Sequence, residues 1–161
     1  MKTIEINPIN DLIFNIKAQE ACKSCKRYGL TGCCPPSIGT FDYYKELIPL
    51  YRYGKLFVET FDINSEDYKK LGTESSLELH KVLLSERNKL FNEGHYYNLL
   101  LGGGSCKYCD KCVIPCRTPQ FRAIPIEATG IDIVSTLRAK GIDISFPVKD
   151  TFLRVGILLW D

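Results

Sequence analysis

Residues 96–116 read YYNLLLGGGSCKYCDKCVIPC. Positions 96–101 form a short apolar run that predicts a buried strand, and the glycines at 102–104 end it. Four cysteines follow within eleven residues, at positions 106, 109, 112 and 116. A strand that runs directly into a glycine turn places the cysteine loop at a strand end, where α/β folds commonly bind ligands.

The spacing of these cysteines is C-x2-C-x2-C-x3-C, which bacterial ferredoxins use to hold a [4Fe–4S] cluster. Two-residue gaps let a tight loop direct three thiolates to three corners of one cluster. A zinc site needs only paired C-x2-C units, so the third cysteine is surplus to zinc. The four are also too crowded to pair comfortably as disulfides. We therefore expect one cluster with these ligands: Cys106, Cys109, Cys112 and Cys116.

A second group of four cysteines lies near the N-terminus, at Cys22, Cys25, Cys33 and Cys34. Three arrangements remain open for it: a second [4Fe–4S] cluster, a zinc ion in an all-cysteine tetrahedral site, or the loan of one cysteine to the first cluster. Side chains of adjacent residues usually diverge, so we expect either Cys33 or Cys34 to be a spectator.

Length and composition indicate a single domain, residues 1–161, with cysteine loops at 21–40 and 102–119. The net charge of +2 gives no general case for nucleic-acid binding. No apolar run is long enough to span a membrane, and the N-terminus lacks the pattern of a signal peptide. We therefore expect a cytoplasmic protein. In that compartment thiols stay reduced, and eight cysteines favour metal over disulfides.

The rest of the chain alternates strand and helix patterns. Strands are predicted at 3–6, 55–63, 96–101 and 152–160, and helices at 41–53, 75–93 and 132–140. Pro49 should split the first helix, and Ser75 with Glu78 forms a capping box for the second. The pattern predicts an α/β fold, an α+β sandwich with one small mixed sheet and helices packed on it. The last strand ends the chain at Asp161, which suggests pairing with a second copy as a homodimer.

Several side chains near the cysteines are candidates for supporting roles. The cations would raise the reduction potential of an anionic cluster and dock an acidic redox partner, with Arg117 the strongest candidate because it adjoins a ligand. They are Lys23, Lys26, Arg27, Lys107, Lys111, Arg117 and Arg122. Glycines 102–104 should let the backbone approach the cluster.

The aromatic side chains and the histidines are expected to have shielding, surface or structural roles. Tyr28 and Tyr108 would shield a cluster from water. We expect surface or structural roles for the two histidines, with His80 near the polar side of its helix and His95 just past the end of that helix. No Ser-His-Asp set and no Walker loop occurs.

The sequence also carries a longer pattern: C-x2-C-x2-Tyr-Gly and Cys-Pro-Pro, then Gly-Gly-Ser-Cys-x2-Cys-x2-Cys and Cys-Arg-x-Pro, then Glu-Ala-x-Gly-Ile-Asp. These motifs occupy residues 22–29, 34–36, 103–112, 116–119 and 127–132. The set resembles an uncharacterised family of predicted metal-binding proteins, domain of unknown function 2284. The resemblance implies metal binding and, through the cysteines, iron–sulfur clusters. It implies Cys22, Cys25 and Cys34 as ligands without requiring Cys33. Three ligands would leave one iron open to substrate, sulfide or a partner's residue.

Together these features predict an iron–sulfur protein with two [4Fe–4S] clusters that transfers electrons as a carrier or as a subunit of a larger enzyme. The expected partner is a redox protein, not a nucleic acid or a membrane. Two alternatives stay open: an enzyme that acts at a cluster with an open iron, and a zinc-stabilised interaction module. The residues specify neither a substrate nor a reaction.

Overall fold

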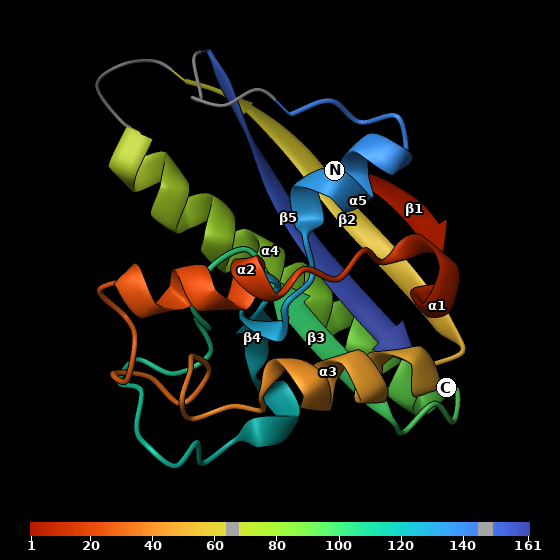
Figure 1. The fold of residues 1–161 in the computed structure, drawn as a ribbon, viewed down its shortest axis with the longest axis horizontal. Coiled ribbons are helices and arrows are strands. Elements are labelled where there is room, and N and C mark those ends of the chain that lie inside the picture. The colour runs from red at the N-terminus through yellow and green to blue at the C-terminus, as the bar shows by residue number, and fades with distance from the viewer. Residues whose placement is uncertain (64–67, 145–149) are drawn as a thin grey trace.

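The computed structural model describes residues 1–63, 68–144 and 150–161. Five strands form one sheet in the order β1-β2-β5-β3-β4, in which only β3 and β4 run parallel (Figure 1). The strands are β1 Lys2–Ile6, β2 Tyr53–Asp62, β3 Asn98–Gly102, β4 Ala123–Pro125 and β5 Thr151–Trp160. The predicted fold class, α+β with one mixed sheet and helices packed on it, is confirmed.

Strand β5 lies in the middle of the sheet because its sequence is apolar on both faces. Val155, Ile157 and Leu159 join the core on one face, and Leu158 joins the core on the other. The strand pairs with β2 along its whole length and with β3 over its last four residues, 157–160. Both backbone edges of the chain's end are therefore bonded. The strand has no free edge for a second copy within the described sheet, and the predicted homodimer stays a prediction.

Helix α4, Tyr68–Asn92, covers one face of the sheet. Its contact with the sheet is a small core of Phe57, Leu79, Leu83, Leu100, Ala123 and Leu158. The predicted start at Ser75 is wrong, because Ser75 lies well inside the helix. Its hydroxyl donates to the Gly72 carbonyl and accepts from Arg154 on β5, so a tertiary contact accounts for a residue that reads locally as a cap.

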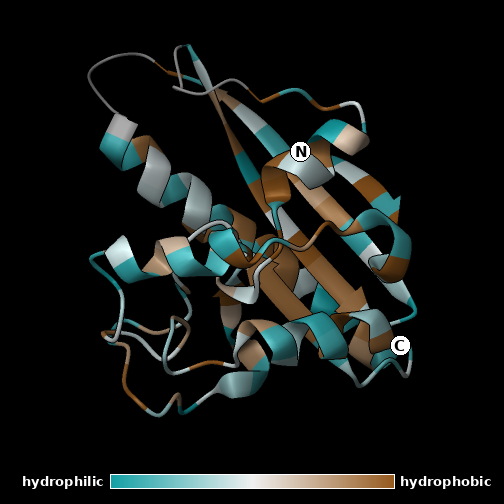
Figure 2. Ribbon diagram, in the orientation of Figure 1, coloured by the Kyte–Doolittle hydropathy of each residue, from teal (hydrophilic) through white to brown (hydrophobic). Residues whose placement is uncertain are grey.

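The opposite face is covered by short helices: α1 Pro8–Asp11, α2 Ile16–Glu20, α3 Phe41–Leu47 and α5 Ile133–Ala139. As predicted, Pro49 stops α3, and a 3-10 turn, η2 Ile48–Leu50, follows it. Asp132 caps α5 by accepting from the Ser135 N–H, as its position indicated. Figure 2 shows that hydrophobic residues concentrate along the central strands between these two layers. Among the described residues, no helix is both long and apolar enough to cross a membrane.

The two cysteine loops lie together at one end of the molecule (Figure 1). The first follows α2 and begins with a 3-10 turn, η1 Ala21–Ser24. The second leaves the end of β3, as predicted, and returns through η3 Pro119–Phe121 into β4. A further 3-10 turn, η4 Glu127–Thr129, packs against α2 and connects β4 to α5. The sheet therefore brings residues about 80 positions apart in the sequence to one place.

Candidate metal centre

The first cysteine loop is a series of tight turns that folds back on itself. The N–H of Cys25 donates to the Cys22 carbonyl at 3.0 Å, and the N–H of Tyr28 donates to the Cys25 carbonyl at 3.0 Å. Gly29 has a φ of 72°, a left-handed conformation that suits glycine, and its N–H bonds the Pro35 carbonyl at 2.9 Å. This closure returns the Cys34 end of the loop toward Cys22, and the two thiols interact electrostatically.

The second cysteine loop presents its thiols at two depths. Cys106 and Cys116 are half-buried, whereas Cys109 and Cys112 are exposed. Burial raises the pKa of the Cys106 thiol, and the backbone N–H groups of Tyr108 and Ala123 partly offset this rise. The Thr118 hydroxyl lies 3.7 Å from the Cys109 sulfur. The loop thus offers its sulfurs both to solvent and to the neighbouring loop.

Direct contacts join the two loops. The Gly32 N–H donates to Cys112 Sγ at 3.3 Å, and the Cys106 N–H donates to Cys33 Sγ at 3.2 Å. A Cβ atom at Gly32 would lie 2.9 Å from the Val113 carbonyl oxygen and 3.1 Å from the Cys116 Cβ. Only glycine therefore lets the loops approach this closely. The sequence placed the cysteines in two groups and left open a shared ligand between them, but it did not specify which residues touch.

Cys33 and Cys34 are both buried, and their sulfurs lie 3.9 Å apart. The expectation that these adjacent side chains diverge is wrong. The Cys34 thiol lowers the pKa of Cys33, with help from the Thr31 hydroxyl and the Cys106 N–H. The same contact, together with burial, raises the pKa of Cys34. The pair therefore readily carries one negative charge, which lies on Cys33 and faces the second loop.

Arg122 joins the two loops, because it follows the second loop and contacts the first. Its Nη1 donates to the Gly32 carbonyl at 2.7 Å, and its charge lowers the pKa of Cys33. Its Nε is buried and has no hydrogen-bond partner within residues 1–63, 68–144 and 150–161. Arg117, which the sequence favoured among the cations, is exposed instead. The sequence favoured Arg117 because it adjoins Cys116, a predicted ligand. Nothing local in the sequence marked Arg122 as the cation that joins the two loops.

His80 fixes the second loop to α4. It is buried with 4% exposure, so its predicted place near the polar side of the helix is wrong, although its contacts are structural as expected. Its Nδ1 accepts from the Lys107 N–H at 3.0 Å, so its Nε2 carries the proton and donates to the Phe121 carbonyl at 3.1 Å. Burial lowers the pKa of His80. His95 sits 2.6 Å from the Asp161 carbonyl at the other end of the sheet.

The contacts of Tyr108 and of the glycines after β3 bear on their predicted roles beside a cluster. Tyr108 stacks on Phe121 with ring centroids 5.0 Å apart and lies beside His80, but it is exposed, and its shielding of a cluster stays a prediction. Gly103 meets Arg154 through its carbonyl, and Gly103 and Gly104 line a cavity next to β5. The proposed approach of these glycines to a cluster stays a prediction.

The donor set suits a sulfur-rich anionic group, although the Cys33 and Cys34 sulfurs, 3.9 Å apart, have the spacing of two ligands of one zinc ion. In the part of the chain that the structure describes, no three His, Cys, Asp or Glu side chains are arranged to hold one metal ion. Ligands of a cubic cluster occupy separate corners and stand farther apart than the four ligands of one zinc ion, whose sulfurs are about 3.8 Å apart given Zn–S bonds of about 2.3 Å. The N–H groups directed at sulfur and the buried Arg122 nitrogen are the partners that such an anion requires.

Charge is segregated along the chain. Residues 21–40 carry three cations and no carboxylate, and residues 102–122 carry four cations and one carboxylate. These two segments have a net charge of +6 in a chain of net charge +2, so the remaining residues have a net charge of −4. Five of the cations are exposed: Lys23, Lys26, Arg27, Lys111 and Arg117.

A family model described as a predicted metal-binding protein, DUF2284, matches residues 5–160. The match spans both cysteine loops and the whole sheet apart from the first residues of β1. No curated protein and no solved structure matches the chain.

Proposed function

The chain belongs to the DUF2284 family of predicted metal-binding proteins, and we propose that it is an iron–sulfur protein that holds two [4Fe–4S] clusters and transfers single electrons. Cys106, Cys109, Cys112 and Cys116 would hold one cluster. Cys22, Cys25 and Cys34 would hold the other, and Cys33 would lie between the two clusters. We propose that the protein works in the cytoplasm, where thiols stay reduced.

The contact between the two cysteine loops is the observation that carries this proposal. Electron exchange between two clusters depends on a short separation, and the loops share two N–H···S hydrogen bonds of 3.3 and 3.2 Å. A structural zinc site would use one closed set of four thiols, so it would leave the remaining cysteines of the two loops without a metal. The thiols instead interact in succession, from Cys25 to Cys22, Cys34, Cys33 and Cys106, and this succession spans both loops.

The chain's own residues would set the properties of the two sites. When bound, the clusters supply one-electron oxidation and reduction. The Gly32 and Cys106 N–H groups donate to sulfur, and the buried Arg122 cation offsets negative charge, so both favour the more negative reduced state. The ring of Tyr108, stacked on Phe121, limits the access of water to one side.

The exposed cations suit an acidic redox partner. A basic face opposite an otherwise acidic body orients the molecule as it approaches a negative surface, which speeds productive encounters. Exposed Cys25, Cys109 and Cys112 lie within this face, so an electron would have a short path to a docked protein. We propose an acidic electron carrier as the partner.

Rapid mixing of the anaerobic protein with a reduced acidic ferredoxin tests this function. The loss of visible cluster absorbance gives the second-order rate. The double substitution Lys26→Glu with Arg27→Glu should slow it about tenfold at low ionic strength, and about 0.5 M salt should remove the difference.

A matched pair of lysines at the opposite end of the molecule separates local docking from net charge. Lys69 and Lys70 are exposed at the start of α4, and Lys69→Glu with Lys70→Glu changes the total charge by the same amount. This control should retain the parent rate within about twofold. Equal slowing by both double substitutions, or no electron transfer in the parent protein, would refute docking on the basic face.

A second function, catalysis at an iron with only three cysteine ligands, is favoured by the orientation of Cys33. Its sulfur accepts from the Cys106 N–H of the other loop, and the residue is 1% exposed, so Cys33 is engaged by the second loop as well as by Cys34. Cys33→Ser should then leave the iron content unchanged. Loss of about four irons would assign Cys33 as the fourth ligand and leave plain electron transfer.

A further inference from the structure

A cavity of about 550 Å³ lies between β5 and α5, and its residues have no role in the function proposed above. Its volume falls in the usual range for small-molecule sites, about 300–1,000 Å³. We propose that this cavity binds a small aliphatic amine, with the alkyl body against its wall and the ammonium group at Glu127.

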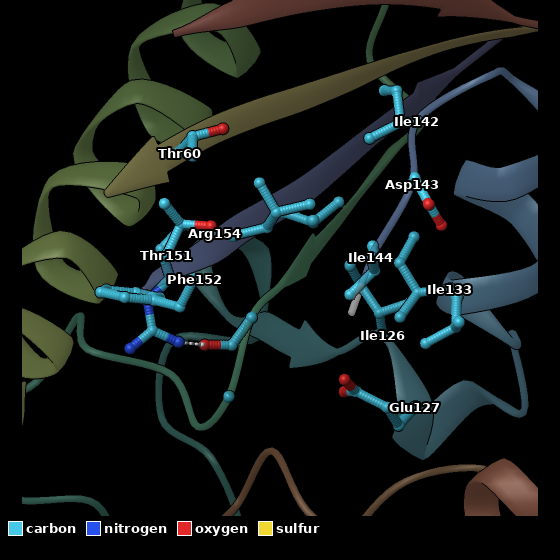
Figure 3. Close-up of a pocket in the computed structure, with 15 residues that line it drawn as sticks. Thr60, Ile126, Glu127, Ile133, Ile142, Asp143, Ile144, Thr151, Phe152 and Arg154 are labelled. Atoms are coloured by element: carbon cyan, nitrogen blue, oxygen red, sulfur yellow. Dashed lines mark hydrogen bonds between the residues drawn. The ribbon is translucent and has the colours of Figure 1, made fainter. Parts of the chain in front are cut away.

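The wall of the cavity is aliphatic and open to water. Ile126 comes from the turn after β4, Ile133 from α5, and Ile142 and Ile144 from the segment after α5 (Figure 3). All but Ile126 are only half-buried, although they pack against the main core. Protein interiors are normally filled at close to crystal density, and exposed apolar surface is unfavourable. Among the described residues this hollow stays open, and its size and aliphatic wall suit a ligand with an apolar body.

The polar end of the cavity carries the Glu127 carboxyl group, whose pKa is raised by burial and lowered by the nearby Arg154 charge. Figure 3 shows the Glu127 carboxylate directed across the gap toward the strand that carries Arg154. The Arg154 guanidinium is held by the Gly103 carbonyl, the Gly72 carbonyl and the Ser75 hydroxyl, so its N–H groups serve the fold. Glu127 lies deep among its neighbours, yet its side chain reaches solvent through the cavity. A carboxylate in this position selects a cation that also donates hydrogen bonds.

This polar end adjoins the first cysteine loop. The turn that carries Glu127 packs against α2, and the Gln19 side chain of α2 donates to the Ala128 carbonyl at 2.7 Å. Helix α2 continues directly into the turn that carries Cys22, and Glu127 interacts electrostatically with that thiol. The head of a bound amine would therefore lie on the side of the cavity nearest Cys22. Binding itself does not depend on the clusters, but a chemical role beside Cys22 rests on the proposed function.

Calorimetric titration of the anaerobic protein with butylamine, pentylamine and hexylamine tests the site. Affinity should rise about fourfold with each added methylene, because about 0.8 kcal/mol is gained for each CH₂ group buried. Hexanol, which has the same body without the charge, should bind at least tenfold more weakly than hexylamine.

Two substitutions and two matched controls locate the binding. Glu127→Gln removes the charge with little change of shape, so it should weaken hexylamine at least tenfold and leave hexanol within twofold. Ile133→Trp fills the cavity and should abolish binding of both. The controls make the same changes on exposed surface elsewhere, Glu46→Gln on α3 and Ile9→Trp on α1, and should bind both ligands like the parent.

Iron and sulfide content is measured on the same samples. The amine site and the iron–sulfur function can therefore be refuted independently of each other. Absence of amine binding in a protein with its full iron content would overturn the site alone. Binding that Glu127→Gln and Ile133→Trp leave unchanged would also overturn it, since the amine would then bind elsewhere. Should Ile133→Trp fail to fold, Glu127→Gln with the hexanol comparison still decides the outcome.

Discussion

At the scale of single residues, Gly32 is the position on which the candidate centre depends most. It donates its N–H to one sulfur, accepts from Arg122 through its carbonyl, and leaves no room for a side chain. No other residue type can occupy this point without moving the loops apart. The feature is invisible in the sequence, where Gly32 is one of 12 glycines.

Gly32→Ala should therefore lose iron. A Cβ atom 2.9 Å from a backbone oxygen forces a shift of several tenths of an ångström between the loops. We expect the iron content per chain to fall by about half, as measured after anaerobic reconstitution. Gly72→Ala on α4 is the matched control, because its Cβ would make an ordinary 3.4 Å contact with the Arg154 side chain, away from both cysteine loops. Full iron content in Gly32→Ala would argue against the importance of the loop contact.

His80 makes the protein sensitive to acid. Burial lowers its pKa from the ordinary value of 6.5, so the unfolded chain takes up a proton more readily than the folded one. The stabilisation of the fold by neutral, buried His80 is complete above about pH 6.5. It is lost as the pH falls through the lower pKa that His80 has in the folded state. His80→Gln keeps a donor for the Phe121 carbonyl but does not titrate. Thermal unfolding at pH 7.5 and 5.5 should show a smaller decrease for His80→Gln than for the parent, and equal decreases would contradict this assignment.

At the scale of the elements, α4 is held to the sheet by a small core that can be tested directly. Leu83 is fully buried against β5, and the Cβ atom of an alanine at Gly156 would lie 3.1 Å from it. Leu83→Ala should lower the free energy of unfolding by about 2–5 kcal/mol in urea titrations. Leu50→Ala, at a leucine with 75% exposure, should change it by less than about 0.5 kcal/mol. Similar effects of the two substitutions would show that this core contributes little.

The sequence predicted the elements that depend on their own hydrophobic pattern. Strands β2, β3 and β5 lie within two residues of their predicted bounds, because apolar and β-branched runs leave few alternatives. The start of α4 could not be found in this way. Ser75 has the local pattern of a cap, but its hydroxyl is bound to Arg154, which is 79 positions away in the chain.

At the scale of the whole molecule, the sequence identified the ligand types but not their arrangement. Spacing alone marked Cys106–Cys116 as one loop, since its four ligands are local. The approach of Cys33 to Cys106 depends on how the sheet and α2 place two distant loops, and no local signal encodes that distance. The cavity at Glu127 was missed for the same reason, since its wall comes from β5, α5 and the turn after β4.

The distribution of charge along the whole chain supports one function for both loops. Both cysteine segments are basic while the rest of the chain is acidic, which suits a protein that receives electrons at one end. Together with the contacts between the loops, this separation of charge makes two adjacent clusters the central claim.

Analysis of iron, acid-labile sulfide and zinc on protein purified without oxygen tests that claim most directly. About eight irons and eight sulfides per chain, with little zinc, are predicted for two [4Fe–4S] clusters. Zinc without iron would contradict the iron–sulfur assignment, and about four irons that persist after reconstitution would contradict the second cluster.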